Sequence, residues 1–349
     1  MNSGLLLVRV EAGPGIGVGH LMRCLALAQA WRRAGGRAMI ASNSLPEPMS
    51  RRITEYGVQR LAIPKDDDGS GLAKLAETHN AAWIVIDGYG FDPEIMERAA
   101  AVGRPVLAID DDMRHSRYPV RALLNQNLHA RNEAYDGKTT ASLLLGPRYA
   151  LIREDLRAAR EWRRQLLGPA QRILVTLGGA DPGGHTETVV HALAASLGNS
   201  NQSFLEIRVV SGGANPRLCR LERISKALPN FRILNDVHDM GAEFRWCDLA
   251  ISASGSTVWE LALFQTPMLL GWTSTVEIPV AKSLERLGAA RVLGPWEEQD
   301  AERISAYALE IGLDQAARQA LAQASGGLVD GLGADRVVEH MRAICETSG

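Results

Sequence analysis

A glycine-rich loop between an apolar strand and an apolar helix places the strongest constraint on the fold of this chain. Glycines alternate at positions 13, 15, 17 and 19, His20 follows at once, and an apolar helix is expected over about 20–34. The apolar run 5–10 before the loop is typical of a buried strand. Glycine lets a ligand come close to the main chain, and a helix N-terminus offers free N–H groups to an anion. The order strand, loop, helix therefore predicts a phosphate-binding site with a titratable imidazole at its mouth.

Strands and helices alternate along the rest of the chain, in two successive blocks. In the first block, strands are expected at 37–42, 58–63, 81–87, 106–110, 122–125 and 142–145. After Gly168-Pro169, further strands are expected at 172–177, 204–211, 231–234, 248–252 and 267–270. Such alternation predicts parallel sheets with helices on both faces. We therefore expect an α/β protein with Rossmann-like domains at 1–158 and 168–325 and a helical tail at 326–349. A helix over about 149–167 would link the domains, and a ligand would lie in a central cleft that the two sheets face.

Composition and charge exclude several classes of protein. The chain has 349 residues and a formal net charge of −2, so no strongly basic surface favours nucleic acid as a partner. Its four cysteines are scattered and form no C-x-x-C pair, which argues against a zinc ribbon and for reduced thiols in the cytoplasm. No signal-peptide pattern and no apolar run of about 20 residues is present, so no membrane span is expected.

Candidate site residues follow the ends of the predicted strands, where ligands bind in parallel sheets. They are Gly17 to His20, Asp87 to Tyr89, and Asp110 to Asp112. We predict His20 as the catalytic residue, although a histidine at this place can also be a cap or a core residue. Asp87 and the acidic run can form turns, hold a divalent metal, orient His20 or contact a sugar hydroxyl. Because no matching set of ligands accompanies them, we expect no metal.

The sequence argues against a dinucleotide cofactor and against a P-loop. The dinucleotide fingerprint that Gly15 and Gly17 could open has His20 at its sixth position, and Ser42-Asn43 rather than an acid ends the second strand. A Gly-Lys-Ser/Thr loop does not occur. We expect no cofactor.

A second small-residue loop, Ser252-Ala-Ser-Gly-Ser-Thr257, enters a helix in the second block. Small hydroxyl residues at a helix N-terminus can hold a diphosphate. Glu260, one turn further on, is placed to accept hydrogen bonds from ribose hydroxyls. The alternative is a helix capped by serine or threonine with no ligand.

Several of these stretches together resemble a known family. They are Gly17-Val-Gly-His-Leu-Met-Arg-Cys-Leu-Ala-Leu-Ala28, Ile86-Asp-Gly-Tyr-Gly90, Ile109-Asp-Asp-Asp112, Leu124-Asn-Gln-Asn127, Gly146-Pro-Arg-Tyr-Ala-Leu-Ile-Arg153, Thr176-Leu-Gly-Gly-Ala-Asp-Pro182 and Ser252-Ala-Ser-Gly-Ser-Thr-Val-Trp-Glu-Leu-Ala262. The chain resembles the UDP-2,4-diacetamido-2,4,6-trideoxy-β-L-altropyranose hydrolases of pseudaminic acid biosynthesis and the related spore-coat polysaccharide proteins. It is more distantly similar to the undecaprenyl-diphospho-muramoylpentapeptide N-acetylglucosaminyltransferases, which have the GT-B fold.

The resemblance implies a GT-B fold and metal-independent, inverting hydrolysis of a UDP-sugar at its anomeric carbon, with His20 as general base on water. Further substrate-binding residues are expected at Gly17, Gly19, Arg23, Asp87, Tyr89, Asp111, Arg148, Gly178, Gly179, Ser254, Gly255, Ser256, Thr257 and Glu260. UDP would lie at the second-domain loop, and the protein would be a monomer or a weak dimer.

One stretch departs from the family pattern. Val276-Glu277 stands where the family hydrolases carry an Asn-Gln pair that faces the sugar. Valine cannot hydrogen-bond a substrate amide, so the sugar differs, Thr273 to Thr275 rebuild the pocket, or the reaction is not hydrolysis. A glycosyltransferase of the same fold and a nucleotide-sugar-binding protein without catalysis are the alternatives.

Overall fold

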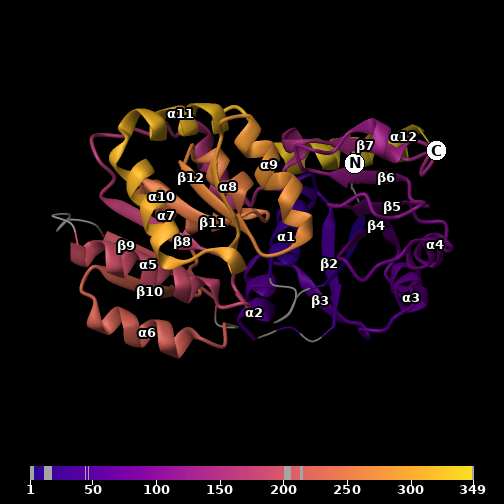
Figure 1. Ribbon diagram of the computed structural model, residues 1–349. Helices are drawn as coiled ribbons and strands as arrows, with labels where there is room; N and C mark the ends of the chain where they lie inside the picture. The colour runs from indigo at the N-terminus through magenta and orange to yellow at the C-terminus, as the bar shows by residue number, and fades with distance from the viewer. Residues whose placement is uncertain are drawn as a thin grey trace. The chain divides into compact units, whose positions relative to one another are not determined.

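The computed structural model describes residues 4–11, 18–43, 45, 47–199, 206–212 and 215–347 of the chain. These residues form two compact α/β units. One contains the N-terminal strand, His20–Arg157 and the chain from Gly331 onward, and the other contains Ala158–Asp330. The prediction of two Rossmann-like domains with parallel sheets is confirmed (Figure 1).

The first unit is built on a seven-stranded parallel sheet of order β3-β2-β1-β4-β5-β6-β7. Its strands are β1 (Leu5–Val10), β2 (Arg37–Ser42), β3 (Gln59–Ala62), β4 (Ala81–Asp87), β5 (Val106–Ile109), β6 (Ala122–Asn125) and β7 (Ser142–Leu145). Its helices are α1 (Gly19–Arg33), α2 (Glu47–Glu55), α3 (Ser70–Thr78), α4 (Pro93–Ala100) and α12 (Gly333–Thr347), with short 3₁₀ turns η1 (Asn132–Tyr135) and η2 (Pro147–Tyr149).

The second unit repeats the plan with a six-stranded parallel sheet of order β10-β9-β8-β11-β12-β13. Its strands are β8 (Arg172–Thr176), β9 (Glu206–Ser211), β10 (Phe231–Asn235), β11 (Leu249–Ala253), β12 (Met268–Trp272) and β13 (Arg291–Pro295). Its helices are α5 (His185–Asn199), α6 (Leu218–Ala227), α7 (Met240–Trp246), α8 (Thr257–Leu263), α9 (Ile278–Arg286), α10 (Ala301–Leu313) and α11 (Gln315–Ser325), with 3₁₀ turns η4 (Thr275–Glu277) and η5 (Trp296–Glu298).

Side chains of the central strand β4 alternate between two cores. Trp83 and Val85 join the core that contains α1, whereas Ile84 and Ile86 join the core on the opposite face. Because successive strand residues point to opposite faces, Asp87 lies on the α1 side. This alternation places a carboxylate under the helix that follows the glycine loop.

The prediction of a helix over 149–167 is wrong. The segment contains the 3₁₀ turns η2 and η3 (Glu154–Glu161) and then runs without regular structure. Arg164 holds the second part by donating to the carbonyl oxygens of Phe244, Cys247 and Phe264. These tertiary contacts outweigh the helix propensity of an Arg-, Glu- and Ala-rich stretch.

The C-terminal helix α12 packs on the first unit, beside β7 in Figure 1. Val337, Val338 and Met341 lie in the same core as α1. Asp335 pairs with Arg33 at 2.5 Å and with Arg157 at 2.7 Å. Helix α12 therefore completes the core of the unit that contains β1 and α1.

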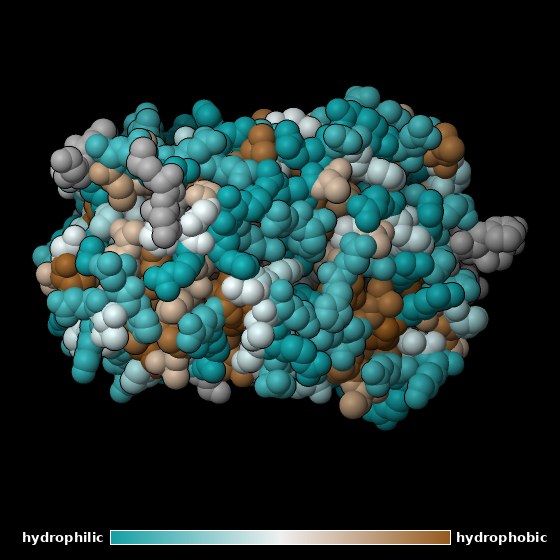
Figure 2. Space-filling view, turned by 180° about the vertical axis from the view of Figure 1, so that it is seen from behind, coloured by the Kyte–Doolittle hydropathy of each residue, from teal (hydrophilic) through white to brown (hydrophobic). Residues whose placement is uncertain are grey.

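The described surface has few large exposed apolar side chains. They are Tyr89, Leu167, Leu287 and Leu313. On the face drawn in Figure 2, hydrophilic residues predominate and apolar ones form separate smaller groups. No described helix combines the length and the apolar character that crossing a membrane requires.

Candidate active site

The strand order of the first unit brings His20 and Asp87 together. The order reverses between β1 and β4, which lie side by side with Val10 opposite Asp87. Ligands bind at such a switch point, beyond the carboxyl ends of the strands. His20 is the second residue of α1, which follows β1 in the chain, and Asp87 ends β4.

Three side chains of α1 donate to the buried carboxylate of Asp87. His20, Arg23 and Cys24 stand at i, i+3 and i+4, on one face of the helix. Oδ1 of Asp87 lies 2.7 Å from His20 Nδ1 and 2.7 Å from Arg23 Nη2. Oδ2 accepts from Arg23 Nε at 2.8 Å and from the Cys24 thiol at 3.2 Å. Asp87 is fully buried, so four protein donors occupy the positions at which its carboxylate accepts hydrogen bonds.

This carboxylate fixes the tautomer of His20. Burial alone would raise the pKa of Asp87, but Arg23 and His20 outweigh it and hold that pKa well below its ordinary value. An ionised carboxylate only accepts hydrogen bonds, so the proton of the short contact is on Nδ1 of His20. Nη2 of Arg23 lies 3.0 Å from the same Nδ1, but its two protons are directed to Asp87 and Asp111. In the neutral imidazole, the lone pair is then on Nε2.

Arg23 joins the ends of two neighbouring strands. Besides its two bonds to Asp87, it donates from Nη1 and Nη2 to Asp111 at 2.9 and 2.8 Å. Asn127 Nδ2 donates to Asp111 Oδ1 at 3.0 Å. Arg23 is 5% exposed, so this guanidinium serves chiefly to fix the two carboxylates.

Asp110 and Asp111, in the acidic run after β5, make different contacts. Asp111 pairs with Arg23, whereas Asp110 accepts from Tyr135 Oη at 2.7 Å and from the Met113 amide at 3.1 Å. Burial raises the pKa of Asp110. Within the described residues, no group of three or more His, Cys, Asp or Glu side chains is arranged to hold a metal ion.

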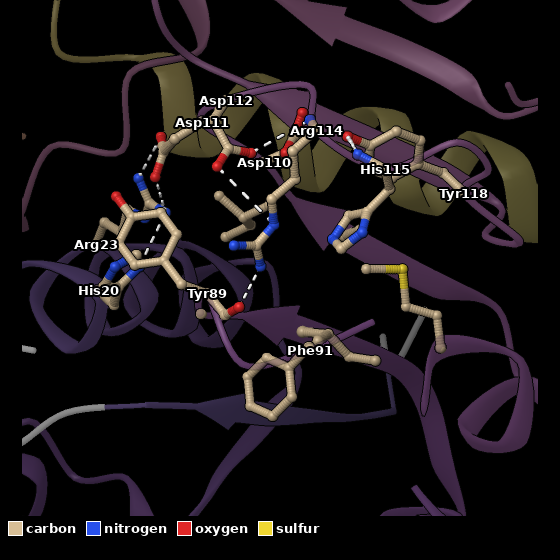
Figure 3. A pocket seen from close by; sticks show the side chains of 15 residues that line it. His20, Arg23, Tyr89, Phe91, Asp110, Asp111, Asp112, Arg114, His115 and Tyr118 are labelled. Atoms are coloured by element: carbon tan, nitrogen blue, oxygen red, sulfur yellow. Dashed lines mark hydrogen bonds and ion pairs between the residues drawn. The ribbon is translucent and has the colours of Figure 1, made fainter. Parts of the chain in front are cut away.

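His20 lines a cavity that lies entirely within the first unit (Figure 3). Its empty volume, open mouth included, is about 360 Å³. Arg23, Tyr89 and Asp111 line it near His20, and His115 and Tyr118 line it farther from His20. Asp110, Asp112 and Phe91 also line it. The ring of Tyr89 meets His20 edge to face, with 4.8 Å between centroids and 88° between planes.

Gly19 and Arg148, two other predicted substrate-binding residues, do not line this cavity. Gly19 opens α1, and Gly17 lies outside the described residues. Arg148 is exposed in η2 and is not among the residues that line the cavity. Cys24 and Asn127, which contact Asp87 and Asp111, were not predicted as site residues. The spacing of Cys24, one turn after His20, is the signal that could have found it.

In the second unit, the predicted residues also follow the strands at a switch point, here between β8 and β11. Gly178 and Gly179 come after β8, and Gly178 has a φ of +100°. Asp181 caps α5 by accepting from the amides of His185 at 3.0 Å and Thr186 at 2.9 Å. The start of α5 is thus already capped by a protein carboxylate.

The loop after β11 carries the predicted nucleotide residues. Ser254 is buried and donates to the Gly271 carbonyl at 2.8 Å, while Gly255, Ser256, Thr257 and Glu260 are partly exposed. The side chain of Ser256, the N-cap of α8, makes no capping hydrogen bond.

Glu277, in the stretch that departs from the family pattern, folds back on its own turn. Its Oε2 accepts from the amide of Thr273 at 2.7 Å and from its hydroxyl at 3.0 Å. Val276 is partly exposed, and Thr273 to Thr275 are exposed.

The fold of the two units is the GT-B fold, which the solved structures similar to this chain share. MurG of Acinetobacter baumannii matches with a TM-score of 0.65 at 13% identity, over 97% of this chain and 99% of that one. An S. aureus MnaA structure with UDP matches at 0.69 and 12%, over 99% and 97%. The spinosyn rhamnosyltransferase SpnG with thymidine diphosphate matches at 0.61 and 16%, over 97% and 100%. The predicted GT-B fold is confirmed.

The curated relatives that match this chain are distant in sequence. The spore coat polysaccharide biosynthesis protein SpsG of Bacillus subtilis is 27% identical over 209 residues, which are 58% of each chain. The UDP-2,4-diacetamido-2,4,6-trideoxy-β-L-altropyranose hydrolase of Campylobacter jejuni is 22% identical over 266 residues, 74% of this chain and 88% of that one. The chain spans 58% of SpsG and 53% of an uncharacterized Methanocaldococcus jannaschii protein, MJ1062. No family model matches the chain.

Proposed function

We propose that this protein hydrolyses a UDP-linked sugar at the anomeric carbon and releases UDP and the free sugar. The contact of His20 with the buried Asp87 at the switch point of the first unit is the observation that carries the proposal. It leaves a basic nitrogen, Nε2, on a residue that lines a cavity. The resemblance to the Campylobacter jejuni hydrolase supports a diacetamido-trideoxy sugar as the substrate.

In the proposed reaction, Nε2 of His20 takes a proton from water as the water oxygen attacks the anomeric carbon. The bond from that carbon to the β-phosphate oxygen breaks, and its electron pair leaves with UDP. Direct attack inverts the anomeric centre. Asp87 and Arg23 act as positioning residues, since Asp87 holds the Nδ1–H tautomer and stabilises the imidazolium that forms. Because UDP is a good leaving group, hydrogen-bond donors on the diphosphate are sufficient without a metal.

Release of UDP in the absence of an acceptor tests this proposal. Purified protein is incubated with UDP-linked diacetamido sugars and with UDP-N-acetylglucosamine, with and without a sugar acceptor and with and without a chelator. We expect equal amounts of UDP and free sugar from a diacetamido substrate, without acceptor and in the presence of chelator. UDP release that requires the acceptor would instead show glycosyl transfer.

We assign the nucleotide to the second unit, at Ser254 to Thr257, with Glu260 on the ribose. Solved structures of the same fold with UDP and with thymidine diphosphate support a nucleotide in a protein of this class. Gly178 and Gly179, which follow the neighbouring strand, are assigned to the diphosphate in the same proposal.

Glu260→Ala is expected to weaken UDP binding about ten- to hundredfold, since hydrogen bonds to a charged group contribute about 1.5–3 kcal/mol each. Isothermal titration calorimetry with UDP measures the change in Kd. Glu285→Ala, on the exposed face of α9 in the same unit, is the matched control and should leave Kd unchanged. An unaltered Kd in Glu260→Ala would remove Glu260 from the nucleotide site.

A further inference from the structure

Tyr89 contacts the imidazole of His20 edge to face and lines the same cavity. It stands between two glycines in the turn after β4 and is 40% exposed, so core packing does not hold it. Gly88 has a φ of +156°, a backbone angle that glycine adopts readily. The amide of Gly90 donates to Glu11 Oε2 at 2.9 Å, which anchors the far end of this turn but not the Tyr89 ring.

Arg114 supplies the contacts that hold Tyr89. Its guanidinium lies over the Tyr89 ring, 5.8 Å from the centroid, and its Nη2 donates to the Tyr89 carbonyl oxygen. Figure 3 shows the Arg114 side chain extending from the loop after β5 toward Tyr89. The same side chain therefore contacts both the ring and the main chain of Tyr89.

Asp112 holds the other end of Arg114. Asp112 Oδ1 accepts from the Arg114 amide at 3.4 Å, and Asp112 Oδ2 lies 3.9 Å from Arg114 Nε. An exposed ion pair of this length contributes little to stability, so the pair alone gives Arg114 no role. The double contact with Tyr89 is what distinguishes Arg114 from an ordinary surface arginine.

We propose that Arg114 is a positioning residue, which holds Tyr89 against His20 and so restrains the imidazole through a contact additional to that of Asp87. Among the described residues, no hydrogen bond or ion pair joins Arg114 to His20, so the effect of Arg114 passes through Tyr89. The kinetic part of this inference rests on the proposed function. The restraint of the imidazole stands independently of any substrate.

The test compares Arg114→Met and Arg114→Lys with Arg117→Met. Arg117 follows in the same loop but pairs with Glu94 and Glu97 at 3.0 Å, at the surface. Protein with ¹⁵N-labelled histidine is examined by NMR, and His20→Asn identifies the His20 signals. We expect the native protein and Arg117→Met to show one sharp Nδ1–H pattern for His20. Arg114→Met should broaden or average this pattern, and lysine, which keeps the charge, should restore it in part.

The kinetic arm separates positioning from substrate binding. Because small displacements of a catalytic group lower rates steeply, kcat for UDP release should fall about tenfold in Arg114→Met with KM nearly unchanged. Tyr89→Ala combined with Arg114→Met should lose little more than Tyr89→Ala alone, since the two act in series.

Two results would overturn the inference. One is an unchanged His20 pattern in Arg114→Met with native backbone amide signals. The other is a rise in KM with kcat unchanged, which would make Arg114 a substrate-binding residue. If the native protein releases no UDP from any sugar, the proposed hydrolysis fails while the NMR arm still decides the role of Arg114.

Discussion

His20→Asn is expected to lower kcat for UDP release about 10²–10⁴-fold, the range over which general-base catalysis acts. Asparagine still offers an N–H to Asp87, so the buried carboxylate keeps a donor. It has no basic nitrogen to accept the proton of water. The variant should therefore fold and bind UDP as the native protein does, and lose only the chemical step. A coupled assay of UDP release measures kcat, and calorimetry measures the Kd for UDP.

His185→Asn is the matched control for this variant. His185 also follows a pair of glycines and begins a helix, but its helix N-terminus is capped by Asp181. The control should keep the native rate. Activity within a few-fold of native in His20→Asn would exclude the general-base role of His20.

Asp87→Asn is expected to reduce kcat by about 10³–10⁴-fold, because the amide reverses the polarity of the contact with His20. An asparagine N–H that donates to Nδ1 moves the imidazole proton to Nε2, where no lone pair remains to accept a proton from water. The variant also leaves Arg23 with one carboxylate, Asp111, instead of two. Breaking a buried ion pair costs about 3–5 kcal/mol, and we expect the lower end because Asp111 remains.

The same variant changes how stability depends on pH. The native pKa of Asp87 lies well below its ordinary value, which is near that of the unfolded chain, about 3.9. Its stabilising contribution is therefore complete above about pH 5, begins to be lost as the pH falls through 4, and is lost in full only at the much lower pKa of the native state. Urea unfolding from pH 7 to pH 3 should show a smaller loss of stability in Asp87→Asn than in the native protein. Asp66→Asn, at an exposed position, should follow the native curve, and parallel curves for all three proteins would contradict this role of Asp87.

The sequence predicted the strands well because each is a short apolar run with a clear boundary. Arg37–Ser42 and Ala81–Asp87 are observed with the expected bounds. His20 and Asp87 could be singled out because each follows or ends a strand. That they touch depends on β1 lying beside β4, a strand order that local pattern does not contain.

Other contacts of the site depend wholly on tertiary structure. The local sequence around Asn127 does not indicate that this residue contacts Asp111. The local sequence around Arg114 likewise does not indicate that it contacts Tyr89. The segment 149–167 has helical composition, yet contacts such as those of Arg164 with distant carbonyl groups determine its path. Helix propensity is a weak preference that such contacts override.

The packing of α12 has a consequence for the order in which the protein folds during synthesis. The core beneath α1 includes Val337, Val338 and Met341. This core therefore stays incomplete until α12 has emerged from the ribosome. Residues 158–330, which form the other unit, emerge earlier, and the described core around Val175 and Ile251 consists of residues from this range alone. Domains generally fold as units while the chain is synthesised. The unit that carries His20 is thus interrupted in sequence by the other unit, and α12 completes its core only after residues 158–330 have been synthesised.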